Sequence, residues 1–194
     1  MSRWLSIAAA VIALDQATKF AVSEWLAGGR VVEMTSFFNF VLAHNAGAAF
    51  SFLAGAAGWQ RLFFSAIAVV AAIWIVVLLR RHAEETVFCA ALSLILGGAL
   101  GNLIDRIWLG AVVDFLDFHA MGWHWPAFNV ADSAITLGVI LLLLDSLMSP
   151  GQPPLMSKLS RLIRKCSQSD PLLVLISIAA YVSGNGLSNE SRMM

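Results

Sequence analysis

Charged residues are scarce in this chain. Of its 194 residues, 12% are charged and 59% are hydrophobic, and the mean hydropathy is +0.80. A soluble domain carries about 25% charged residues, so this chain lacks the polar surface that water requires. The composition indicates an integral membrane protein. Lys plus Arg equals Asp plus Glu, with 12 of each, and this balance gives no indication of a nucleic-acid partner.

Ligand and nucleophile motifs are also missing. The two cysteines, Cys89 and Cys166, lie far apart and form neither a disulfide framework nor a metal-binding spacing. His119 and His124 have no convincing third ligand, so we expect no metal and no cofactor. The sequence has no G-x-S-x-G elbow. Ser/His or Ser/Lys catalysis is therefore not favoured by any motif, although the residue types are present.

What the chain does have is long apolar segments. A membrane-spanning helix needs about 17–25 residues, and four segments are long enough: about Trp4–Trp25, Leu62–Leu79, Val87–Ile104 and Val130–Met148. Asp15 and Lys19 interrupt the first, and no small-x-small site ends it, so it is predicted to be a span and not a cleavable signal peptide. We predict a mainly α, polytopic membrane protein whose four transmembrane helices lie within residues 1–150.

The positions of Lys and Arg predict the orientation, because cytoplasmic loops are enriched in them. With four spans, one side of the membrane receives Arg3, Arg80, Arg81, Lys158, Arg161, Arg164 and Lys165, and the other only Arg30, Arg61 and Arg106. Both termini are therefore expected in the cytoplasm. The two longer loops, about 26–61 and 105–129, are expected to face outward. Tryptophans gather at the same outer boundary, where an aromatic belt is typical: Trp25, Trp59, Trp108, Trp123 and Trp125.

Two further segments have a distinct character. Val31–Thr35 and Ser36–Val41 are rich in β-branched and aromatic residues and are predicted to form short strands beside the membrane. Residues 151–194 form a C-terminal tail that is first basic, from Lys158 to Lys165, and then apolar. Its apolar run, Leu172–Val182, is too short to cross a bilayer, and no role is assigned to it.

Polar residues near the outer ends of the spans carry the functional prediction, because carboxylates near lipid are costly. Asp15 and Lys19 are four residues apart and can pair on one helix face, and Asp105 with Arg106 is a candidate boundary ion pair. Asp114, Asp117 and Asp132 remain as catalytic candidates. Two close carboxylates in a low-dielectric site do not both ionise easily, so one can activate water while the other donates a proton.

Five motifs, in the same order and spacing, resemble those of the lipoprotein signal peptidase family, signal peptidase II of bacteria. They cover about residues 4–148 and are Asp15-Gln16-Ala17-Thr18-Lys19, Asn45-Ala46-Gly47-Ala48-Ala49-Phe50-Ser51, Gly101-Asn102-Leu103-Ile104-Asp105-Arg106, Val112-Val113-Asp114-Phe115 and Phe128-Asn129-Val130-Ala131-Asp132-Ser133. The resemblance implies an aspartyl endopeptidase of the bacterial inner membrane. It would remove signal peptides from diacylglyceryl-modified prolipoproteins and be inhibited by globomycin-type peptides.

The same resemblance implies the site and the fold. Asp114 and Asp132 match the catalytic pair, and the surrounding site residues match Asp15, Lys19, Asn45, Gly101, Asn102, Arg106, Asn129 and Ala131. The implied fold has four transmembrane helices with a small β-sheet and loop elements on the periplasmic face. Asp117 repeats the Asp-Phe pattern of Asp114, and the tail after Lys165 exceeds the family's usual length.

Two other classes of protein use similar residues. A small transporter or proton pathway also places carboxylates and lysines inside the membrane, although the carboxylates here gather toward one face and no inverted repeat is evident. A non-catalytic assembly subunit could use the polar residues to join helices. Cleavage of a lipidated prolipoprotein by the purified protein distinguishes the peptidase from both.

Overall fold

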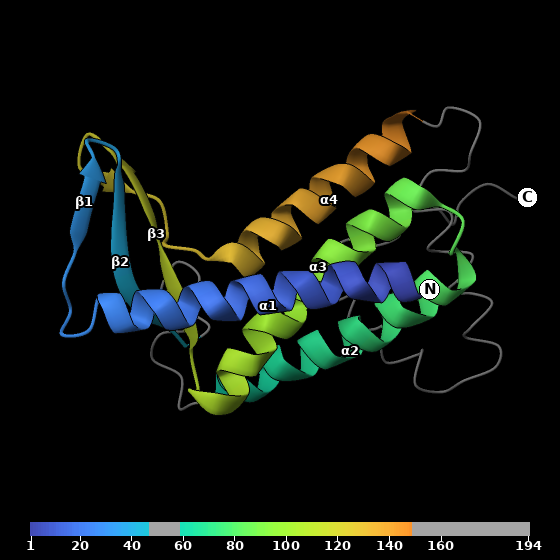
Figure 1. The fold of residues 1–194 in the computed structure, drawn as a ribbon, viewed down its shortest axis with the longest axis horizontal. Helices are drawn as coiled ribbons and strands as arrows, with labels where there is room; N and C mark the ends of the chain where they lie inside the picture. The colour runs from blue at the N-terminus through green and yellow to red at the C-terminus, as the bar shows by residue number, and fades with distance from the viewer. Residues whose placement is uncertain (47–58, 149–194) are drawn as a thin grey trace, which may run out of the picture. The chain divides into compact units, whose positions relative to one another are not determined.

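Four long apolar helices dominate the computed structural model, which describes residues 1–46 and 59–148 (Figure 1). They are α1 (Ser2–Trp25), α2 (Trp59–Arg81), α3 (Thr86–Trp108) and α4 (Val130–Met148), and each is long and apolar enough to cross a membrane. The 19 residues of α4, the shortest, extend over about 28 Å, close to the thickness of a bilayer's hydrocarbon core. The predicted four-span, mainly α architecture is confirmed.

The outer ends of α2 and α3 differ from the prediction. Helix α2 already begins at Trp59, and α3 continues to Trp108. Asp105 and Arg106, which were placed in an outer loop, therefore lie in the last turns of α3. Since a helix directs its side chains to fixed positions, these two residues face defined neighbours.

Helix α3 approaches α1 and α4 closely at two glycines. A Cβ atom on Gly97 would lie 2.7 Å from Cβ of Val11 in α1, and one on Gly98 would lie 2.4 Å from the carbonyl oxygen of Ala131 in α4. Neither distance is tolerable for a side chain. The missing side chains let the helix backbones approach closely, and α3 is the most buried of the four helices.

The segments between α1 and α2 and between α3 and α4 form a four-stranded antiparallel sheet. Its strands are, in order, β1 (Val32–Thr35), β2 (Phe38–Asn45), β3 (Val112–Ala120) and β4 (Trp123–His124). The two predicted strands are confirmed as β1 and β2, and β2 continues further, to Asn45. Strand β3 was not predicted. Its Phe115 packs against Val22 and Leu26 at the end of α1, so the sheet is fixed to the helical bundle by apolar contact.

The predictions for residues 47–51 of the second motif and for the tail from residue 149 onward lie outside the described residues. The described site lies within Met1–Asp145, which forms one compact unit.

Candidate active site

Asn129 joins the two candidate catalytic carboxylates, which come from different elements. Asp114 lies near the start of β3, and Asp132 lies in the first turn of α4. The Asn129 Nδ2 donates to Oδ1 of Asp114 at 2.7 Å, and its Oδ1 accepts from the Asp132 backbone N–H at 2.9 Å. Its own backbone N–H donates to Oδ2 of Asp132 at 3.3 Å. This reciprocal arrangement is a capping box for α4, and it brings Asp132 to the residue that also holds Asp114.

Two further asparagines complete the hydrogen bonding of the pair. Nδ2 of Asn102 donates to Oδ1 of Asp132 at 2.7 Å, and Nδ2 of Asn45 donates to Oδ2 of Asp114 at 3.1 Å. Every oxygen of both carboxylates thus accepts a hydrogen bond from a neutral amide. Neutral donors orient a carboxylate without neutralising its charge, so the pair keeps its capacity for acid–base chemistry.

The environment of Asp114 favours its protonated form. Its side chain is buried, with 3% of the residue exposed. Burial, the larger cause, and the nearby charge of Asp132 raise the pKa of Asp114 to about 6, against the hydrogen bonds from Asn45 and Asn129 and the charge of Lys19. A carboxyl group of this kind can hold a proton where an exposed aspartate would not.

A buried lysine, Lys19, contacts three residues that surround the carboxylate pair. The Lys19 ammonium contacts Oδ2 of Asp15 at 2.9 Å, Oδ2 of Asp105 at 2.8 Å and Oδ1 of Asn102 at 2.9 Å. Its three donors therefore each have an acceptor. The predicted pairing of Asp15 with Lys19 is confirmed. Because Asn102 also donates to Asp132, Lys19 positions the amide that contacts this carboxylate.

Asp105 pairs with Lys19, and the expected ion pair with Arg106 is wrong for the described structure. Successive residues of a helix point in different directions, so neighbours such as these do not face each other. The Arg106 guanidinium donates instead to the Asn102 carbonyl oxygen at 3.3 Å and lies over the Phe64 ring at 5.5 Å from its centroid.

Gln16 and Asp105 link three elements and were not among the predicted site residues. Nε2 of Gln16 donates to Oδ1 of Asp105 at 2.9 Å and to the Gly101 carbonyl oxygen at 3.2 Å. Oδ2 of Asp105 accepts from the Val113 backbone N–H at 3.1 Å, next to Asp114. The available signal was that both are polar residues in apolar helices and belong to the matched motifs.

Asp15 holds the start of α4. Its Oδ1 accepts from the Ala131 backbone N–H at 2.9 Å, one of the N–H groups that a helix start leaves without a partner. A Cβ on Gly101 would lie 2.6 Å from Oδ2 of Asp15, so glycine is needed where α3 passes this carboxylate. Asp15, Gly101 and Ala131 thus form the contact among three helices behind the carboxylate pair.

Asp117 occupies a different environment from Asp114. Its carboxylate accepts a hydrogen bond from Asn39 at 3.2 Å and contacts Nδ1 of His124 at 2.9 Å. These partners belong to β2 and β4. Asp117 therefore forms hydrogen bonds between strands of the sheet, whereas Asp114 contacts the asparagines around Asp132.

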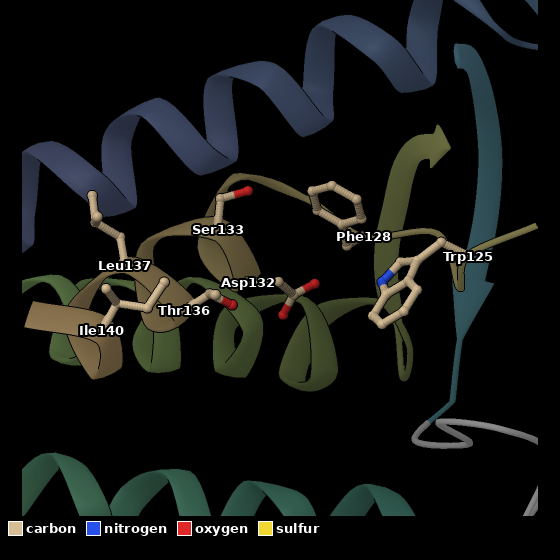
Figure 2. A pocket seen from close by; sticks show the side chains of 7 residues that line it. All are labelled: Trp125, Phe128, Asp132, Ser133, Thr136, Leu137 and Ile140. Carbon is tan, nitrogen blue, oxygen red and sulfur yellow. The ribbon is translucent and has the colours of Figure 1, made fainter. Parts of the chain in front are cut away.

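A groove runs along α4 from Asp132, and we call it the α4 groove (Figure 2). Its volume is about 500 Å³, and its wall is mostly apolar. The lining residues are Trp125, Phe128, Asp132, Ser133, Thr136, Leu137 and Ile140. Polar residues lie near the start of α4, and Leu137 and Ile140 lie further along it. An apolar chain can thus lie beside the helix while a polar group reaches Asp132.

The fold and the site define a multi-pass membrane protein with a carboxylate pair at one end of its bundle, in which Asp114 is buried and Asp132 is half-buried. The profile of the family described as Signal peptidase (SPase) II matches residues 7–148. The chain belongs to this family and is a membrane peptidase.

Named relatives and solved structures agree with this assignment. The lipoprotein signal peptidase of Paraburkholderia phytofirmans is 60% identical over 147 residues, covering 76% of this chain and 86% of that protein. That of a Janthinobacterium species is 54% identical over 152 residues, covering 78% and 92%. A bacterial membrane enzyme solved by the in meso method at 2.3 Å resolution matches with a TM-score of 0.68 and 35% identity, covering 78% of this chain and 91% of that one.

Proposed function

We propose that this protein is an aspartic endopeptidase that removes the signal peptide from diacylglyceryl-modified prolipoproteins. Its family and its named relatives support signal-peptide removal from prolipoproteins. The observation that carries the aspartic mechanism is the bridge made by Asn129, whose amide donates to Asp114 and whose backbone and side chain cap Asp132. Such a bridge holds two carboxylates together so that they can act on one bond.

The two aspartates have different roles in this mechanism. Asp132 lies in the first turn of α4 and accepts hydrogen bonds from the Asn102 side chain and the Asn129 backbone N–H. Asp132 takes a proton from water as the water oxygen attacks the scissile carbonyl carbon. Protonated Asp114 donates to the developing oxyanion. When the tetrahedral intermediate collapses, the C–N bond breaks and the amine nitrogen takes the proton held by Asp132, while one hydroxyl of the intermediate returns its proton to Asp114 as the new carboxylic acid forms.

The supporting residues maintain this geometry. Asn102, Asn45 and Asn129 orient the carboxylates, while Asp15, Lys19, Gly101 and Ala131 hold the helices behind them. Arg106 lies over Phe64 beside Asn102. Its positive charge would offset part of the negative charge of the pair, which is electrostatically coupled to it.

The substrate's acyl chains would remain among membrane lipids while the scissile bond reaches the carboxylates. A globomycin-type peptide would compete by occupying the same carboxylate site. The transporter alternative is not favoured, because the named relatives are peptidases.

The direct test is cleavage by the purified protein in detergent, with a diacylglyceryl-modified prolipoprotein and the same precursor without lipid. We expect cleavage of the lipidated precursor and much slower cleavage of the other. Equal cleavage of both would contradict the proposed lipid requirement, and no cleavage of either would contradict the function.

The raised pKa of Asp114 predicts a pH dependence. The active form has one proton on the pair, so kcat/KM should fall as the pH rises through about 6 and Asp114 ionises. Bound substrate excludes water and favours the neutral acid further, so the corresponding fall in kcat should occur at higher pH. Measuring both parameters from pH 4.5 to about 9 checks this sign. A kcat/KM that rises as the pH increases from about 6 upward would contradict it.

The charge distribution predicts that both termini face the cytoplasm and that the active site faces outward. Reporter fusions after Arg81 and Lys165 should then read as cytoplasmic, and fusions near Gly55 and Met121 as external. An external reading at Lys165 would contradict the proposed orientation.

A further inference from the structure

The hydroxyl group of Thr136 is placed to serve a ligand in the α4 groove. Thr136 is exposed and lines the groove together with Asp132, one helical turn away. Other helix hydroxyls bond to the carbonyl four residues earlier: Thr18 to Leu14 at 2.9 Å, and Ser133 to Asn129 at 2.9 Å. Among the described residues Thr136 has no such bond, so its hydroxyl remains available for a partner from outside the chain.

The chemistry of the proposed cleavage creates a need for such a donor. A helical peptide hides its backbone carbonyls in internal hydrogen bonds, so the segment at the carboxylate pair must be extended before water can attack it. An extended segment at membrane depth carries free carbonyl groups, and each one left without a donor there is costly. The further wall of the groove, at Leu137 and Ile140, supplies none.

The position along α4 indicates which carbonyl is involved. Four residues of helix separate Asp132 from Thr136, which is about 6 Å along the axis. An extended peptide covers that distance in about two residues. A signal peptide enters with its positively charged amino end toward the cytoplasm. In the proposed orientation, α4 runs from Asp132 toward the cytoplasm, so Thr136 lies beside the amino side of the scissile bond.

We propose that Thr136 is a substrate-binding residue whose hydroxyl donates a hydrogen bond to a backbone carbonyl about two residues before the scissile bond. This inference rests on the proposed function and names the part of the substrate that occupies the α4 groove: the extended end of the signal peptide. The bond exists in bound substrate and in the transition state alike, so it should affect KM more than kcat.

The first experiment replaces Thr136 and measures both kinetic parameters on a synthetic diacylglyceryl lipopeptide. Thr136→Val removes the hydroxyl at nearly constant volume and should raise KM about tenfold with kcat nearly unchanged. Thr136→Ser should stay near wild type because it keeps the hydroxyl. Thr18→Val makes the same substitution in α1 outside the groove and should not change KM.

The second experiment identifies the carbonyl. Three lipopeptides each carry one ester in place of a backbone amide before the scissile bond, which weakens that carbonyl as an acceptor. For wild type, the ester about two residues before the scissile bond should raise KM several-fold more than the other two esters. For Thr136→Val that difference should disappear. If Thr136→Val does not fold, Thr136→Ala takes its place in both experiments.

An unchanged KM for the hydroxyl-free variant, or an ester pattern identical in both enzymes, would overturn the inference. The proposed function fails separately, if Asp114→Asn or Asp132→Asn retains turnover. Loss of turnover in those variants, together with an unchanged KM for Thr136→Val, would reject the role of Thr136 alone.

Discussion

Asp114→Asn and Asp132→Asn should each lower turnover of a lipidated prolipoprotein by about 10²- to 10⁴-fold, the range that a positioned acid or base contributes. Each change removes one of the two groups that exchange protons with water and substrate. The asparagine side chain still presents an oxygen acceptor to the surrounding amides, so the fold should persist. Single-turnover rates on quantified, purified enzyme measure this effect without interference from expression.

The raised pKa of Asp114 supplies an internal check on folding. Ionisation of a buried carboxyl with a raised pKa is penalised in the folded state, so Asp114 costs stability as the pH rises through about 6. Asp114→Asn should therefore unfold at the same temperature as wild type or higher at pH 8, with less benefit at pH 4. An inactive but stable variant would separate catalysis from stability.

Asp117→Asn is the matched control, because it makes the same substitution on the same strand. Asp117 contacts His124 and Asn39 within the sheet, so this change should reduce turnover much less. Near-normal cleavage by Asp114→Asn, or an equal loss for Asp117→Asn, would contradict the assignment of the pair.

The second large effect is expected for Lys19→Met. This substitution removes the cation that contacts both Asp15 and Asp105 and leaves two carboxylates buried without a counter-charge. Breaking a buried ion pair by removing one partner costs about 3–5 kcal/mol. We expect a large fall in the unfolding temperature in detergent. The loss of activity should follow the loss of folded protein.

A double substitution tests the electrostatic cause. Asp105→Asn in the Lys19→Met background removes one uncompensated charge while leaving an oxygen acceptor for Val113, so it should restore part of the lost stability. Arg80→Met, which removes an exposed cation at the end of α2, is the control and should have little effect. If the double variant is no more stable than Lys19→Met, charge compensation is not the cause.

The sequence predicted those parts of the site that depend on local spacing. The four-residue separation of Asp15 and Lys19 gives one helix face, and this pair was predicted and is confirmed. The partner of Asp105 was not predictable in this way, because Lys19 lies on a different helix and only tertiary packing brings them together. Neighbourhood in sequence suggested Arg106 instead, which the geometry of a helix does not favour.

Strand β3 was not predicted, because its burial also depends on contacts with residues distant in the sequence. Val112, Val113, Asp114 and Phe115 are all buried, so the alternation of buried and exposed residues that reveals a strand is missing. The burial comes from contacts with α1 and from the site. Gln16 likewise gains its importance from Asp105 and Gly101, which are distant in sequence.

The spacing of Asp15 and Lys19 also affects how the chain enters the membrane during synthesis. Helix α1 is made long before α3, so Lys19 must pass into lipid before Asp105 exists. Its partner four residues earlier is already on the same helix, and the two together enter the bilayer as a neutral pair. Asp105 then pairs with a lysine that is already in the membrane. The start of α4, the last helix, docks against the Asp15 carboxylate of α1, the first helix.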